Sequence, residues 1–263
     1  MLDRFNTVTT GDRRQMPSKS VEGDLSLKSE VGILLPTYCE AANIGKLIYE
    51  IENLGLNVSI LVIDDSSPDG TAALVRSLND KYGNIMVCVR PRKSGLGTAI
   101  TDGFKIFLSL KNPPDYIVTM DADYSHSPRD VPRVVFAARK ANGLAIGSRY
   151  CLGGGTINWG ISRLAISRVA NLLSSVLIGA EIHDYTSGLR CYSMNLVRNI
   201  VGELHSETYE IQIETIRQAR KKGFSIREVP MVFMNRKKGK SKLTKNEIRE
   251  FLSYTLRIGL EPK

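Results

Sequence analysis

The feature that most constrains the fold is a regular alternation of short apolar runs with segments of helical periodicity. Five runs rich in valine and isoleucine predict buried strands: Val31–Pro36, Val58–Asp64, Ile85–Arg90, Tyr116–Asp121 and Leu144–Ser148. Helical spacing follows the first four of them: Ala41–Asn53, Thr71–Tyr82, Leu96–Leu110 and Pro128–Ala141. Such alternation is typical of an α/β domain in which helices cover both faces of a mostly parallel central sheet.

The later part of the chain has a different character. Gly153-Gly154-Gly155 predicts a flexible loop, and helices are expected over Asn158–Leu177, Thr208–Lys222 and Lys245–Arg257. Strand patterns cover Ser187–Ser193 and Phe224–Met234, and a basic loop spans Arg236–Lys242. We therefore expect a flexible polar tail over 1–30, one α/β domain over 31–243 with a C-terminal elaboration, and a basic helix within 244–263.

The net charge narrows the class of partner. The 263-residue chain carries a formal charge of +9, which suits nucleic acid, anionic lipid or phosphorylated substrates. The positive charge is concentrated after Ile216, and we interpret the dense run Arg236–Lys242 as phosphate-binding rather than as a solvated face. The sequence has neither an RNP-type aromatic motif nor a zinc finger, so we expect no nucleic-acid partner.

Cysteine and hydropathy patterns bear on the compartment. The four cysteines form no CxxC pair, which predicts free thiols and a reducing environment. The polar start of the chain lacks the apolar core of a secretory signal, and we expect no segment long and apolar enough to span a bilayer. The apolar stretch Leu164–Ala180 is interrupted by polar residues, a pattern that favours lying on a membrane or packing inside the protein.

Polar residues gather where the predicted strands end, which is where open α/β sheets bind ligands. Asp121-Ala122-Asp123 follows the fourth strand and places two carboxylates where they can share one Mg²⁺ or Mn²⁺ ion. The alternative is that both aspartates merely shape the turn before Pro128. The position after a buried strand, beside other polar strand ends, favours the metal site.

The remaining strand ends suggest further contacts. We assign Asp65 to the sugar or base of a nucleotide, and Asp69-Gly70 to the start of the next helix. Lys93 and its basic neighbours precede Gly95-Leu96-Gly97, which is consistent with phosphate contact or with an ordinary charged helix N-terminus.

Three residues after the fifth predicted strand suit an anion. Arg149 directly follows that strand and would reach the same cleft to grip a phosphate. Arg163 and Ser167 share a helix face and would hold a second anion, or else are simply polar surface residues.

Taken together, these segments resemble the dolichol-phosphate mannosyltransferases of glycosyltransferase family 2. Seven segments carry the resemblance. In chain order they are Pro36-Thr-Tyr-Cys-Glu40, Asp64-Asp-x-Ser-Pro-Asp-Gly-Thr71, Lys93-x-Gly-Leu-Gly-Thr98, Asp121-Ala-Asp-x-Ser-His-x-Pro128, Gly147-Ser-Arg-Tyr150, Asp184-x-Thr-Ser-Gly188 and Gly239-Lys-Ser-Lys242. The resemblance extends over about Val31 to Lys242. It implies a Rossmann-like GT-A fold and transfer of mannose, with inversion, from GDP-mannose to dolichyl (polyprenyl) phosphate for protein glycosylation. It also implies a Mg²⁺ or Mn²⁺ cofactor and a place on the cytoplasmic face of a membrane.

The same resemblance implies roles for individual residues. The donor site would be formed by Pro36, Tyr38, Glu40, Ile63, Asp65, Asp121, Ala122, Asp123, Arg236 and Lys242. The metal would be held by Asp121 and Asp123 with Ser125 as a further polar contact, and the lipid phosphate by Arg149, Arg163 and Ser167. Catalysis would rest on Asp121, Asp123, Arg149 and Arg236, with no general base because a phosphate oxygen is already anionic.

Some features depart from the family pattern or leave rival functions open. Cys39 stands where asparagine is common. The transmembrane helices of some relatives are not seen, so anchoring would come from the Asn158–Leu177 helix, from basic charge or from a small membrane-anchoring subunit. The rivals are glycosyl transfer from a UDP-sugar to polyprenyl phosphate and a non-catalytic subunit of the same fold.

Overall fold

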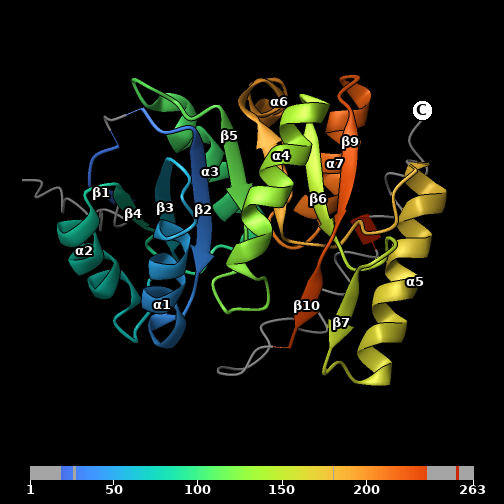
Figure 1. Ribbon diagram of the computed structural model, residues 1–263, viewed down its shortest axis with the longest axis horizontal. Coiled ribbons are helices and arrows are strands. Elements are labelled where there is room, and N and C mark those ends of the chain that lie inside the picture. The colour runs from blue at the N-terminus through green and yellow to red at the C-terminus, as the bar shows by residue number, and fades with distance from the viewer. Residues whose placement is uncertain (1–18, 26–27, 180, 236–252, 255–263) are drawn as a thin grey trace, which may run out of the picture.

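A long twisted sheet forms the centre of the computed structural model, which describes residues 19–25, 28–179, 181–235 and 253–254 (Figure 1). Within these ranges, eight strands form the main sheet in the order β1-β4-β3-β2-β5-β8-β6-β9. Their bounds are β1 Ser20–Glu22, β2 Val31–Thr37, β3 Val58–Asp64, β4 Ile85–Val89, β5 Tyr116–Thr119, β6 Leu144–Ser148, β8 Arg190–Ser193 and β9 Ile226–Pro230. A small parallel pair, β7 Gly155–Ile157 and β10 Val232–Met234, lies apart from it.

Helices cover both faces of the sheet, as the alternation predicted. One face carries α1 Ala41–Glu52, α2 Thr71–Tyr82 and α4 Val131–Ala141, whose buried side chains pack in one core cluster. The other carries α3 Leu96–Ser109, α6 Met194–Ile200 and α7 Ile211–Lys221. The 3-10 turns Pro128–Asp130 and Val201–Glu203 and the long helix α5 Ile161–Ile178 complete the set. In Figure 1, α5 stands at one end of the molecule beside β7.

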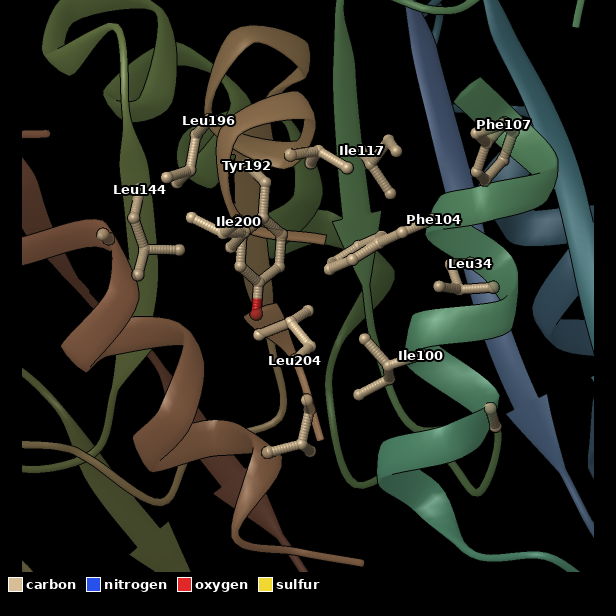
Figure 2. Close-up of a cluster of buried hydrophobic side chains, with 14 of the residues drawn as sticks. Leu34, Ile100, Phe104, Phe107, Ile117, Leu144, Tyr192, Leu196, Ile200 and Leu204 are labelled. Carbon is tan, nitrogen blue, oxygen red and sulfur yellow. The ribbon is translucent and has the colours of Figure 1, made fainter. Parts of the chain in front are cut away.

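The core beneath α3 shows how the second face is sealed (Figure 2). Phe104 of α3 meets Tyr192 of β8 edge to face, with ring centroids 5.0 Å apart. Leu34, Ile117 and Ile200 close around this pair, and all are fully buried. Burying an aromatic or large aliphatic side chain stabilises a fold by about 1.5–3 kcal/mol, so this cluster fixes α3 and α6 against the sheet.

Strand direction brings several loops to one edge of the sheet. Strands β3, β2 and β5 are parallel neighbours, so the residues after Asp64, Thr37 and Thr119 emerge together. Strand β8 runs antiparallel between β5 and β6, which places its preceding segment, 184–188, at the same edge. The end of β6, and with it Arg149, also emerges there because β6 runs in the same direction as β5.

Three expectations were wrong in detail. The polar tail is not free throughout, because β1 pairs antiparallel with β4, Glu22 forms an ion pair with Arg76, and Leu25 is buried. The single strand expected over Phe224–Met234 is divided, since β9 joins the main sheet while β10 pairs with β7. The glycine-rich loop contributes Gly155 to β7. Short strands such as these carry too few residues to show a period.

Helix α5 presents its apolar side outward. Its buried positions are Asn171, Ser174 and Ile178, whereas Val169, Leu172 and Val176 are 55%, 65% and 69% exposed. By length and composition this helix is long and apolar enough to cross a membrane, so the expectation that no segment qualifies was wrong. Asn171 ties this side of the helix to the domain through hydrogen bonds with Tyr185 and Thr186.

Candidate active site

A cleft opens at the edge of the sheet where β2, β3 and β5 end. The empty space inside it, including the open mouth, is about 680 Å³. Eight residues predicted to bind a nucleotide sugar line this one cleft: Pro36, Tyr38, Glu40, Ile63, Asp65, Asp121, Ala122 and Asp123. The other two, Arg236 and Lys242, lie outside the described residues, as does the rest of the basic loop.

The Asp121-Ala122-Asp123 turn is held by hydrogen bonds with the buried residues that follow it. The backbone N–H of Asp121 donates to Nδ1 of His126 at 3.1 Å, and His126 is fully buried. Asp123, also buried, accepts the backbone N–H of Ser125 at 3.0 Å. Because Nδ1 of His126 acts as an acceptor, the ring proton is placed on Nε2. The aspartates therefore shape a turn, as the alternative reading proposed, while both also line the cleft.

The oxygen donors of this turn fit a divalent cation. Two carboxylates share the cleft, and Oγ of Ser125 is buried with no hydrogen-bond partner in the part of the chain that the structure describes. An orphaned buried hydroxyl costs free energy unless something binds it, which suits a metal or its bound water. No group of three or more His, Cys, Asp or Glu that could hold a metal occurs among the described residues. The protein would thus supply a partial set, to be completed by substrate oxygens.

Asp65 reaches the cleft from a buried network. One carboxylate oxygen accepts Nε of Arg90 at 2.5 Å and the other accepts the backbone N–H of Ser94 at 3.2 Å. Arg90, which is almost fully buried, also donates to Thr98 and to the carbonyl of Gly95. Arg90 therefore orients Asp65 rather than meeting a ligand itself.

Two backbone N–H groups at the N-terminus of α3 are already hydrogen-bonded. The backbone N–H groups of Gly97 and Thr98 both donate to the carbonyl oxygen of Glu207. A Cβ at Gly97 would lie 2.2 Å from the carbonyl oxygen of Ser206, so glycine is required for this close approach. Gly97 therefore has a structural role, while Gly95 and Leu96 line the cleft. Lys93 also lines the cleft, with its Nζ 5.1 Å from the centre of the Tyr38 ring.

The loop after β2 holds Cys39 in a conformation that asparagine adopts more readily. Cys39 has φ of 58°, in the left-handed region where asparagine is enriched and most other residues are strained. Its backbone N–H donates to Oγ of Ser67 at 2.8 Å, which ties this loop to the one after β3. Asp69 accepts the backbone N–H groups of Ala41 and Thr71, confirming its structural role.

Arg149 is buried against Asp184 in the segment before β8. Its Nε and Nη2 lie 2.7 Å and 2.6 Å from the two carboxylate oxygens, and Nη2 also donates to Thr186. Burial alone would lower the pKa of Arg149, but the charges of Asp184 and, more weakly, Asp121 raise it. The Asp121 carboxylate and the Arg149 guanidinium thus lie within electrostatic reach of each other.

Arg163 and Ser167 sit on the side of α5 that faces Arg149. Tyr150 donates from its hydroxyl to Oγ of Ser167 at 2.7 Å, and Nη1 of Arg163 donates to Oδ1 of Asn235 at 3.0 Å. Both guanidinium groups contact the ring of Trp159, at 5.2 Å for Arg149 and 4.2 Å for Arg163. The structure therefore brings the three predicted acceptor residues into one neighbourhood.

Several residues of this site carried no functional prediction. Tyr209, Leu96 and Ala99 line the cleft but belong to the apolar spacing of helices or to a turn. Gly188 abuts the Asp121-Ala122-Asp123 turn, since a Cβ there would lie 3.2 Å from Oδ1 of Asp121 and from Cε1 of His126. The motif Asp184-x-Thr-Ser-Gly188 was the available signal, but its spacing alone does not reveal what each residue touches.

Comparison with known proteins agrees with this geometry. The model of glycosyl transferase family 2 matches residues 32–201. The polyprenol monophosphomannose synthase of Mycolicibacterium smegmatis is 39% identical over 230 residues, which cover 87% of this chain and 86% of that protein. The undecaprenyl-phosphate mannosyltransferase of Micrococcus luteus is 33% identical over 228 residues, which cover 86% and 93% respectively.

A solved structure shares the fold at much lower identity. It is glucosyl-3-phosphoglycerate synthase from Mycobacterium tuberculosis in complex with Mn²⁺, uridine diphosphate and phosphoglyceric acid. That structure superposes with a TM-score of 0.67 at 17% identity and covers 89% of this chain and 80% of its own. Its fold and the two sequence relatives lead to the same assignment: the chain belongs to glycosyltransferase family 2 and has the GT-A fold.

Proposed function

We propose that this enzyme transfers mannose from GDP-mannose to a dolichyl or other polyprenyl phosphate, with inversion at the anomeric carbon and with Mg²⁺ or Mn²⁺ as cofactor. The observation that carries the proposal is the gathering of the predicted donor residues of three strand ends in one cleft, with the predicted acceptor residues at its side. The two relatives, named as mannosyl-transferring enzymes acting on polyprenyl carriers, support the sugar and the acceptor class. The product would serve protein glycosylation.

The donor half of the site would hold the nucleotide and its diphosphate. Tyr38 and Glu40 would meet the guanosine end, and Asp65, oriented by Arg90, would accept hydrogen bonds from the nucleoside. Asp121 and Asp123 would hold the cation, with Ser125 as a further contact, directly or through water. A bound Mg²⁺ or Mn²⁺ would act as a Lewis acid on the departing diphosphate. Arg236 and Lys242 would close over the phosphates.

The acceptor half would align an anion for in-line attack. Arg149 and Arg163 present two positive charges on one aromatic ring, and Ser167 lies one helical turn from Arg163. An oxygen of a phosphate monoester is already negative near neutral pH, so these residues need only position it and no side chain has to remove a proton. Rate enhancement would come from orientation and from charge stabilisation of the leaving group.

The surface around α5 is suited to a lipid bilayer. Twelve large hydrophobic residues are exposed in the described parts of the chain, and nine of them lie within 152–176 or 232–234. Leu152, at 99%, is the most exposed of these. Arg168 is exposed on α5 among them and would meet anionic headgroups. The acceptor residues Arg163 and Ser167 are on the same helix, so docking would bring the lipid phosphate to the site.

This arrangement supports the bilayer as the occupant of the apolar face. By the family resemblance, we propose the cytoplasmic side of the membrane as the location. The four cysteines are free, as expected in a reducing compartment. A small membrane-anchoring subunit is the alternative occupant, which the vesicle experiment described below separates from direct lipid binding.

A donor assay tests the reaction. The purified chain is incubated with labelled GDP-mannose or UDP-glucose and a polyprenyl phosphate, and the label in the organic phase is measured. We expect mannosyl lipid from GDP-mannose, loss of product with chelator, and recovery with Mg²⁺ or Mn²⁺. Asp121→Asn and Asp123→Asn should each lower turnover by at least about 100-fold, because each removes a metal ligand.

The other outcomes identify the rivals. Product from UDP-glucose alone would assign the site to a UDP-sugar. No lipid-linked product from either donor would favour a non-catalytic role and overturn the proposal. Full activity of both aspartate variants would remove the metal from the mechanism.

A further inference from the structure

Two aromatic rings each contact both arginines of the acceptor side. The guanidinium carbon of Arg163 is 4.2 Å from the centre of the Trp159 ring and 5.6 Å from that of Phe233. The guanidinium carbon of Arg149 is 5.2 Å and 5.7 Å from the same two rings. All four distances are within the range of cation–π attraction. Each ring therefore contacts both cations.

This arrangement addresses a physical difficulty. The two guanidinium groups that contact these rings carry like charges, which repel each other, and the buried carboxylate of Asp184 offsets the charge of Arg149. The negative faces of the two rings offset a further part of the repulsion. An incoming anion would then find both cations in place.

The rings are themselves fixed to the rest of the site. Trp159 and Phe233 meet edge to face with centroids 5.2 Å apart, and Phe233 meets His126 in the same way at 5.2 Å. The backbone N–H of Met234, next to Phe233, donates to the carbonyl oxygen of Ser125 at 3.1 Å. Phe233 thereby joins the acceptor arginines to the turn that carries Asp121 and Asp123.

We infer that Trp159 and Phe233 form an aromatic bracket, a pair of positioning residues that holds Arg149 and Arg163 ready for the phosphate monoester of the acceptor. The inference rests on the proposed function and adds to it two residues that neither touch the donor cleft nor belong to the family segments named above. The bracket acts through the arginines, so its loss should weaken acceptor binding while donor binding is kept.

Steady-state kinetics separate the bracket from simple packing. Trp159→Leu removes one ring from both arginines, and we expect the acceptor KM to rise about 5- to 30-fold with the donor KM unchanged. Trp159→Phe keeps a ring and should stay within about 3-fold of the wild type. Phe136→Leu is the matched control. Phe136 also makes a cation–π contact, with Nζ of Lys140 4.6 Å from its ring centre, but it lies on α4 and outside the acceptor site.

The kinetic outcomes decide the matter. An unchanged acceptor KM in Trp159→Leu overturns the bracket, and so does an equal loss in Trp159→Phe, which would show that shape rather than the π face matters. If Trp159→Leu does not fold, Phe233→Leu takes its place with the same expected pattern.

A second measurement needs no catalysis. Trp159 is the only tryptophan in the chain, so its emission reports on this site alone. We expect a saturable emission change on titration with a water-soluble short-chain isoprenyl phosphate, and none with the corresponding isoprenol. A flat emission trace alongside normal mannosyl transfer would overturn the bracket and leave the proposed function standing. A saturable emission change without sugar transfer from any donor would support the bracket and overturn the proposed function.

Discussion

Arg149 and Asp184 form a two-pronged ion pair in which both side chains are almost completely buried, with nitrogen–oxygen distances of 2.7 Å and 2.6 Å. Removing one partner of such a pair leaves an uncompensated charge in a poorly hydrated place. We therefore expect Asp184→Asn to lower the free energy of unfolding by about 3–5 kcal/mol, measured by denaturant titration. The same change should raise the acceptor KM, because Arg149 would lose its orientation.

A surface pair provides the control for that variant. Asp130, which directly precedes α4, is paired with Arg133 at 2.7 Å, and the side chains of Asp130 and Arg133 are 14% and 50% exposed. Asp130→Asn should cost less than about 1 kcal/mol, as exposed pairs do. Equal stabilities for Asp184→Asn and Asp130→Asn would show that the buried pair contributes nothing special.

The ion pair also predicts how stability depends on pH. Burial raises the pKa of Asp184, but the charge and hydrogen bonds of Arg149 outweigh it and hold the pKa below the ordinary value of 3.8. A lowered pKa in the folded state stabilises the fold at higher pH, and this contribution is lost as the pH falls below that ordinary value and through the folded pKa. The unfolding free energies of wild type and Asp184→Asn should therefore differ fully at pH 6, and the difference should narrow once the pH falls below 3.8, so that it is smaller at pH 3. A constant difference across this range would contradict the assignment.

A substitution at Gly188 tests whether the 184–188 segment fixes the position of the Asp121-Ala122-Asp123 turn. A methyl group at this position would press on Oδ1 of Asp121 and on the ring of His126. We expect Gly188→Ala to lower kcat by about 10-fold or more and to weaken Mn²⁺ binding, because the carboxylate must shift. Gly202→Ala is the matched control, since a Cβ there meets nothing within 4 Å. Unchanged kcat and metal affinity in Gly188→Ala would contradict the idea that the 184–188 segment fixes the position of Asp121.

The central strands and the cleft were predictable because both depend on local pattern. Val58–Asp64 is a buried strand with its predicted bounds, and a parallel sheet brings such strand ends to one edge. Of the predicted cleft residues, Asp65, Asp121 and Asp123 follow from that rule, whereas Pro36, Tyr38, Glu40, Ile63 and Ala122 came from the family resemblance. Local turn chemistry likewise gave the role of Asp69 correctly.

What the sequence could not reveal depends on contacts between distant residues. The carbonyl oxygen of Glu207 accepts the backbone N–H of Gly97 at the N-terminus of α3, although the two residues are 110 positions apart in the chain. The pairing of Arg149 with Asp184 is equally remote in sequence. Helix α5 shows the same limit, since its pattern defines an apolar side but does not tell which side faces the protein. Asn171 decides this, because its side chain hydrogen-bonds the backbone of Tyr185 at 2.6 Å and the hydroxyl of Thr186 at 3.2 Å.

The outward apolar side of α5 leads to the last prediction, which concerns the membrane. Leu172 and Val176 point away from the domain, and transferring each side chain out of water contributes roughly 1.5–3 kcal/mol. We expect the double change Leu172→Gln and Val176→Gln to lower partitioning onto anionic vesicles about 100-fold or more, as measured by flotation. Phe136→Gln, on α4, replaces an equally exposed apolar residue and should float like the wild type. If the wild type itself fails to bind vesicles of any composition but floats with a membrane subunit, that subunit rather than the bilayer covers α5. Retained flotation of the double variant would instead place the lipid contact elsewhere on the basic surface.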